Sequence, residues 1–100
     1  MAVAATFRFK VADVESARKQ GKIANDIWTK AGATSARALT VMVGPNVGNW
    51  IFHLEFPDLA TFEKARAKVR ASPEFKEWTV VNAKVGNTVI DAGLFDEIVL

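Results

Sequence analysis

The stretch Asn49–Phe56, NWIFHLEF, decides the fold of this chain. Large apolar residues occupy every second position, and the positions between them are of mixed character. A period of two is typical of a β-strand with one face in a hydrophobic core. The apolar face comprises Trp50, Phe52, Leu54 and Phe56, and the mixed face Ile51, His53 and Glu55. Burying side chains of this size contributes about 1.5–3 kcal/mol each, so the apolar face should decide which side of the sheet the helices cover.

Further strands are predicted on both sides of this stretch. Val3–Val11 and Arg37–Val43 alternate with the same period. The turn residues Gly44–Gly48 join Arg37–Val43 to the deciding stretch, so the two strands should form a hairpin. A last strand is expected over Leu94–Leu100, and Thr88–Ile90 is interpreted as a bent part of it or as a separate strand.

Two amphipathic helices are predicted between the strands. Asp13 and Asp58 stand at positions typical of helix N-caps, and apolar residues then recur at steps of three and four. The first helix should end at Gly32, where a left-handed residue commonly terminates a helix. Ser72–Glu74 should start a further short helix, because Pro is preorganised for the first helical position. Gly86 and Asn87 should end it.

The order β-α-β-β-α-β predicts a single α+β domain over residues 1–100, with a ferredoxin-like, antiparallel four-stranded sheet and both helices on one face. Phe7 and Phe9 should join the apolar face beneath the helices. The reverse face would carry Thr6, Arg8, Lys10, Ile51, His53 and Glu55. Open faces of this kind are commonly closed by symmetric dimerisation. We therefore expect a second copy of the chain to cover it, with a small-molecule pocket between the sheets.

The composition excludes several kinds of site. The chain has no cysteine, which excludes disulfides, thiolate catalysis and cysteine-based metal sites. It has one histidine, which excludes a histidine-rich metal site within one subunit. We expect neither a metal nor a cofactor.

The charge pattern bears on the partners. With 13 basic and 11 acidic residues the net charge is only +2, and no basic cluster typical of nucleic-acid binding is present. The residues Lys64, Arg66, Lys68 and Arg70 lie along a helix between apolar residues, and we interpret them as a solvated face. The N-terminus is not typical of a signal peptide, and no stretch approaches about 18 apolar residues. We expect a cytoplasmic protein without a nucleic-acid or membrane partner.

His53 is the candidate catalytic residue, because an imidazole gains and loses protons near neutral pH. Glu55, two residues further on the same face, and Arg8, whose guanidinium matches paired oxygens, are the candidate substrate-binding residues beside it. Two alternatives remain open: His53 is hydrogen-bonded at a dimer interface, and Arg8 forms a structural ion pair with Glu55 or with an acid of the partner subunit.

Trp28 and Trp78 are candidate aromatic walls of a substrate pocket, the first near a helix end and the second on the short helix after Ser72. Tryptophans at helical spacing are also frequent core residues, so a purely structural role is the alternative for both.

The chain resembles the dimeric α/β-barrel superfamily, which includes antibiotic-biosynthesis-monooxygenase-like and NIPSNAP-like proteins. The resemblance covers nearly the whole chain. It is carried by the segments Trp28–Ala33, Gly44–Gly48, Glu55–Phe62 and Ala71–Phe75.

This resemblance implies a ferredoxin-like monomer whose sheet pairs face to face with that of a second copy. Members of the superfamily include cofactor-independent oxygenases, isomerases, cyclases and haem-degrading enzymes. The haem-degrading members carry an iron-ligating histidine on the second helix, whereas Leu59–Arg70 contains none. We expect a homodimer that binds a small aromatic or carbonyl metabolite, as a cofactor-independent monooxygenase or an isomerase. The alternative is a non-catalytic binding or oligomerisation module.

Overall fold

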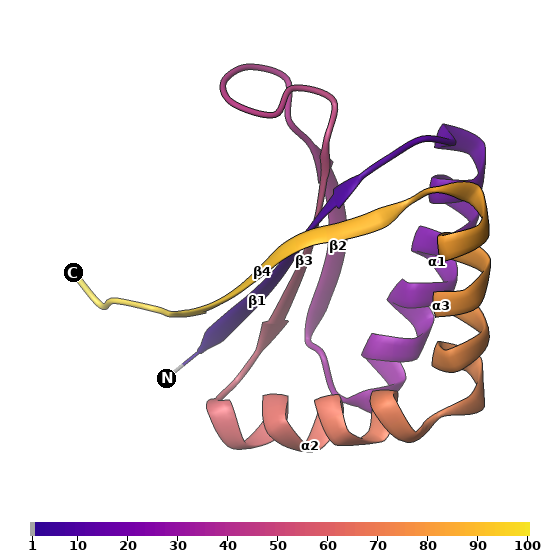
Figure 1. The fold of residues 1–100 in the computed structure, drawn as a ribbon. Coiled ribbons are helices and arrows are strands. Elements are labelled where there is room, and N and C mark those ends of the chain that lie inside the picture. The colour runs from indigo at the N-terminus through magenta and orange to yellow at the C-terminus, as the bar shows by residue number, and fades with distance from the viewer. Residues whose placement is uncertain (1) are drawn as a thin grey trace.

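The computed structural model of the chain describes residues 2–100. Its elements follow the order β-α-β-β-α-α-β (Figure 1). They are β1 (Val3–Lys10), α1 (Val14–Ala31), β2 (Ser35–Thr40), β3 (Trp50–Phe56), α2 (Leu59–Ala71), α3 (Pro73–Val85) and β4 (Thr88–Asp96). The predicted ferredoxin-like α+β fold is confirmed: the four strands form one antiparallel sheet in the order β2-β3-β1-β4, and the helices lie on one side of it.

The register of β1 and β3 gives the sheet the two faces that the sequence predicts. Phe7 lies opposite Phe52 and Val3 opposite Phe56, so both apolar sets share the face beneath the helices. Thr6 lies opposite His53 on the reverse, which we call the open face. The core under the helices is aromatic: the Trp28 ring lies 6.1 Å from Phe7 and 6.2 Å from Phe56.

The helix ends follow the predicted caps. The side chains of Asp13, Asp58 and Ser72 each accept a hydrogen bond from a backbone N–H three residues later. Gly32 and Gly86 end α1 and α3 with positive φ. The helix after Ser72 has the predicted ends: its 13 residues run from Pro73 to Val85, and Gly86 terminates it.

The bounds of β1 and β3 differ from the prediction by one residue, and those of β2 and of the last strand differ by more. β2 covers Ser35–Thr40 rather than Arg37–Val43, and residues 41–49 form a loop in which Gly44, Asn46 and Gly48 take positive φ. The last strand covers Thr88–Asp96 rather than residues 94–100.

The sheet itself explains the position of this last strand. β4 pairs along β1 from Lys10 to Val3, with one irregularity where the register shifts between Arg8 and Phe9. Within residues 2–100, Ala2 is the last residue of that segment available to pair with the chain beyond Asp96, and its carbonyl accepts a hydrogen bond from Glu97 N–H. Residues 88–90 accordingly belong to one bent strand.

The buried side-chain amide of Asn87 links the start of α1 to the junction of α3 and β4. The Asn87 side-chain oxygen accepts from the backbone N–H groups of Ala12 and Asp13 at 2.8 and 3.1 Å, and its amide group donates to the Asp13 carbonyl. These bonds fix the start of α1 against the junction of α3 and β4. Among residues 2–100, no helix is both long and apolar enough to cross a membrane.

Candidate functional site

A pocket of about 460 Å³ lies on the helix side of the sheet, where β1 and β4 meet α2 and α3. This volume falls in the range of sites for small molecules. The strand residues Phe7, Ala92 and Leu94 form its floor. The aromatic side chains of Trp28, Phe62 and Phe75 form its walls, and Arg66 and Arg70 form its rim.

The pocket exists because β4 is an edge strand that the helices leave uncovered. α2 runs across the end of α1 and α3 rather than alongside them (Figure 1). The corner between α2 and β4 therefore receives no helix, and Leu94 stays exposed although it lies on the helix side opposite Ala5. Ala92 adds room, because it puts only a methyl group into the corner.

The aromatic walls are held in place by other rings. Trp28 is 6% exposed and lies between Phe7 and Phe56. Phe62 packs edge to face on Phe56 at 5.2 Å. Phe75 stacks on Trp78 at 5.5 Å with nearly parallel rings. A flat apolar ligand would therefore meet preformed surfaces.

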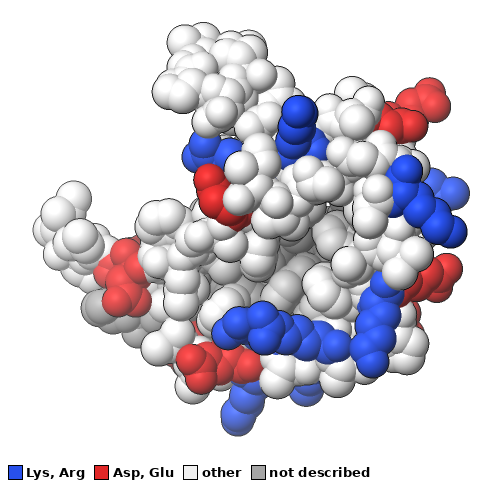
Figure 2. Space-filling model, viewed as in Figure 1, with Lys and Arg blue, Asp and Glu red and all other residues white. Residues whose placement is uncertain are grey.

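The rim of the pocket is basic. Arg66 and Arg70 lie one turn apart on α2, and neither guanidinium forms an ion pair within residues 2–100. Figure 2 shows a hollow at the centre of the view with Lys and Arg side chains along the edge formed by α2.

Trp78 has a structural contact of its own. Its indole N–H donates to the Gln20 carbonyl at 2.8 Å, and its ring meets Phe9 edge to face. It lines a separate hollow of about 40 Å³, which has room for only a few waters. Its contribution to the larger pocket is to support Phe75.

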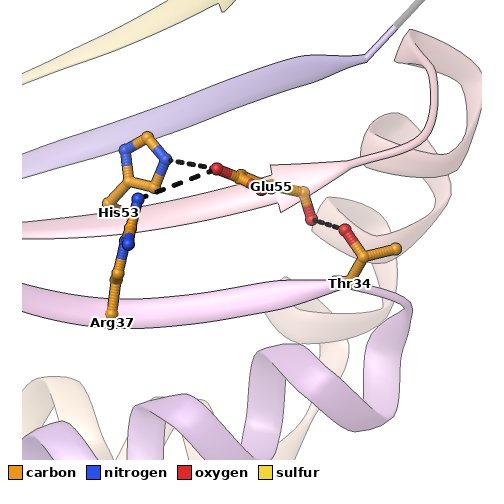
Figure 3. Close-up of polar contacts among 4 residues, drawn as sticks. All are labelled: Thr34, Arg37, His53 and Glu55. Carbon is orange, nitrogen blue, oxygen red and sulfur yellow. Dashed lines mark hydrogen bonds and ion pairs between the residues drawn. The ribbon is translucent and has the colours of Figure 1, made fainter.

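The open face carries a polar cluster around Glu55 (Figure 3). Glu55 Oε1 lies 3.1 Å from His53 Nε2 and 3.9 Å from a terminal guanidinium nitrogen of Arg37. Since an ionised carboxylate only accepts hydrogen bonds, Nε2 is the protonated nitrogen in this contact. The Thr34 hydroxyl donates to the Glu55 backbone carbonyl at 3.1 Å.

Arg8 also lies on the open face, but it is paired with Asp91 rather than with Glu55. Arg8 Nε lies 3.7 Å from an Asp91 oxygen, too far for a hydrogen bond, and this buried nitrogen has no hydrogen-bond partner in residues 2–100.

The sheet therefore separates the five residues predicted for one site. His53, Glu55 and Arg8 lie on the open face, whereas Trp28 and Trp78 lie on the helix side. Within one subunit, a ligand that touches Trp28 in the pocket does not reach His53. The described residues 2–100 contain no group of three or more His, Asp or Glu side chains placed to hold a metal ion.

Arg66 and Arg70 are exposed, as the predicted solvated face requires, but their place at the rim of a pocket was not predicted from the sequence. A signal was available: Arg66 follows Phe62 by four residues and Arg70 follows Arg66 by four. Residues at this spacing lie on the same side of a helix as Phe62. The sequence therefore predicts that both arginine side chains lie along the edge of the buried face.

Comparison with known structures confirms the predicted fold. No protein-family model matches the sequence, and no curated protein matches it. An uncharacterised NIPSNAP-like domain protein from Burkholderia xenovorans has a TM-score of 0.70 at 13% identity, with 97% of this chain and 85% of that chain covered. A candidate monooxygenase from Shewanella loihica has a TM-score of 0.69 at 20% identity, with coverages of 99% and 96%. SnoaB from Streptomyces nogalater, a cofactor-independent oxygenase, has a TM-score of 0.66 at 19% identity, with coverages of 99% and 95%.

The chain therefore shares its ferredoxin-like fold with proteins described as monooxygenases and as NIPSNAP-like.

Proposed function

We propose that the protein is a homodimeric, cofactor-independent monooxygenase that acts on a small aromatic substrate bound in the pocket between α2, α3, β1 and β4. The observation that carries the proposal is the pocket itself, with its preformed aromatic walls and basic rim. The fold shared with SnoaB, a cofactor-independent oxygenase, supports the reaction type.

The pocket suits an electron-rich aromatic substrate. Its rings would stack against Phe62 and Phe75, and a guanidinium of the rim would stabilise a phenol or enol oxygen in its deprotonated form. Such an anion reduces O₂ directly. An activated ring CH₂ group becomes C=O, and O₂ supplies the carbonyl oxygen and the oxygen of one water. The substrate supplies all the electrons, and both hydrogens of the CH₂ group leave in that water.

The open face is the proposed dimer interface. It combines apolar side chains such as Leu39 and Phe95 with paired charges at Glu55 and Arg8. A mixed face can meet its own copy about a two-fold axis, because each group then faces a complementary group of the partner. His53 and Glu55 would become buried at that interface. The catalytic role predicted for His53 stays a prediction.

Oxygen consumption tests the proposed reaction. The chain is supplied with hydroxylated naphthalene and anthracene compounds that carry an activated ring CH₂ group, and O₂ uptake is measured with an electrode. Ala92→Trp should abolish uptake by filling the pocket, whereas Ala83→Trp, on an exposed part of α3, should leave it unchanged. Uptake that survives Ala92→Trp would refute the assignment of the pocket.

A non-catalytic binding protein is the second candidate, and one observation favours it. The described residues that line the pocket include no histidine and no carboxylate, so they offer no ordinary general base for removing a proton from the substrate. Ligand binding without any O₂ uptake, over the whole substrate panel, would select this alternative.

A further inference from the structure

We infer that the ligand of this pocket carries a carboxylate group, which Arg66 and Arg70 bind while its aromatic ring system occupies the apolar interior. The inference shares the pocket with the proposed function and adds the chemical class of the ligand. It holds whether the pocket performs catalysis or only binding.

The first argument is the placement of the two charges. Residues at i and i+4 lie on the same side of a helix, so Arg66 and Arg70 present two guanidinium groups to the same rim. Each guanidinium is a planar fork of donors that matches the paired oxygens of a carboxylate. Two like charges at this spacing repel one another, and a bound anion would relieve that repulsion.

The second argument is a contrast with the arginines of the open face. Arg8 and Arg37 each have a carboxylate partner within the chain, at Asp91 and Glu55. Arg66 and Arg70 have none in residues 2–100. Glu63 lies near both in a shallow groove on the outer side of α2, yet forms no ion pair with either. The rim thus keeps two unneutralised cations beside apolar surface.

The third argument is the character and size of the interior. Apart from the two arginines, the lining consists of apolar residues, among them Phe62 on α2, Phe75 on α3 and Leu94 on β4. A volume of about 460 Å³ accommodates a ring system rather than a single small anion such as acetate. Charge at one edge and apolar surface inside together fit an aromatic acid.

Two matched probes test this inference. Naphthalene-2-carboxylate and naphthalene-2-carboxamide have the same ring system and nearly the same shape, and only the first is an anion. Binding is measured by calorimetry and by quenching of tryptophan fluorescence, since Trp28 lines the pocket. The wild-type chain should bind the carboxylate about 10-fold or more tightly than the amide, and added salt should reduce this preference.

Matched variants locate the effect. The double substitution Arg66→Gln and Arg70→Gln should weaken carboxylate binding about 10- to 100-fold and leave amide binding unchanged. Lys68→Gln on the same helix is the control, because Lys68 lines a different hollow between α1 and α2 and its loss should change neither affinity. Circular dichroism checks that all variants remain folded.

Equal affinity for the two probes in the wild-type chain would overturn the inference. So would a carboxylate preference that survives the double substitution, or the absence of binding for both probes at millimolar concentration. The outcomes are separable from those of the proposed function. Arginine-dependent carboxylate binding with no O₂ uptake on any substrate refutes only the oxygenase, whereas O₂ uptake on neutral substrates without carboxylate preference refutes only this inference.

Discussion

The two faces of the sheet differ in how their apolar side chains are buried and in how their arginines are paired. The helix side buries aromatic residues against α1 and α2 and leaves one corner hollow, with two arginines that have no acidic partner within residues 2–100. The open face neutralises its arginines within the chain and leaves Leu39 and Phe95 exposed. The difference fits the two proposed tasks, which are ligand binding on the helix side and association with a second copy on the open face.

A matched pair of phenylalanines provides the largest expected effect. Phe56 is 1% exposed on the helix side, and Phe95 is 56% exposed on the open face. Phe56→Ala should lower the free energy of unfolding by about 3–5 kcal/mol, because it leaves a cavity in the core.

Phe95→Ala should cost under about 1 kcal/mol in the monomer, because the removed ring already contacts water. Urea unfolding followed by circular dichroism measures both values in the dimer-disrupting background described next. Similar losses for the two variants would contradict the division of the sheet into a packed and an open face.

The second prediction concerns association. Leu39 is 45% exposed and lies opposite Ile51 on the open face. Leu39→Asp places a charge at the proposed interface and should raise the dimer dissociation constant by about 30-fold or more.

Val80→Asp is the matched control, because Val80 is 53% exposed on the helix α3, away from the open face. Analytical ultracentrifugation measures the constant for each chain. A wild-type chain that stays monomeric at every concentration, or equal effects of the two substitutions, would exclude the open face as the interface.

The sequence was sufficient for the fold because its strongest signals are local. Strict alternation in residues 50–56 fixes which side chains share a face, and Asp13, Asp58 and Ser72 mark the helix starts through short-range caps. The end of β4 was predicted wrongly because it depends on where β1, more than 80 residues earlier, begins. No local pattern contains that information.

The site was harder to predict for a related reason. The alternation correctly predicted that Trp50 and His53 lie on opposite faces of the sheet. The predicted site nevertheless combined residues from both faces. The pocket arises where α2 crosses the ends of its neighbouring helices, and this angle is a tertiary property. Arg66 and Arg70 therefore acquire their importance from β4, which approaches them only in the folded chain.

The third prediction decides between the two roles of His53. If the open face is an interface, His53→Gln should weaken dimerisation by about 3- to 10-fold, through the lost contact with Glu55, and should leave naphthalene-2-carboxylate binding within about 2-fold. Ultracentrifugation and calorimetry provide the two measurements. A sharp fall in ligand affinity or turnover, with dimerisation intact, would instead establish the catalytic role predicted from the sequence.

The smallest expected effect concerns the start of α2, the helix that carries the pocket arginines. The Asp58 carboxylate accepts a hydrogen bond from Thr61 N–H at 2.7 Å, and this bond lowers the pKa of Asp58 below its ordinary value of 3.8. A group whose pKa is lower in the folded state stabilises the fold above its unfolded pKa, and this contribution disappears as the pH falls through the folded pKa. Compared with Asp58→Asn, whose amide caps the helix at every pH, the wild-type chain should lose stability more steeply below about pH 4. Thermal unfolding at pH 6, 4 and 3 measures the difference, and parallel curves for the two chains would show that this carboxylate does not contribute to the acid sensitivity of the helix side.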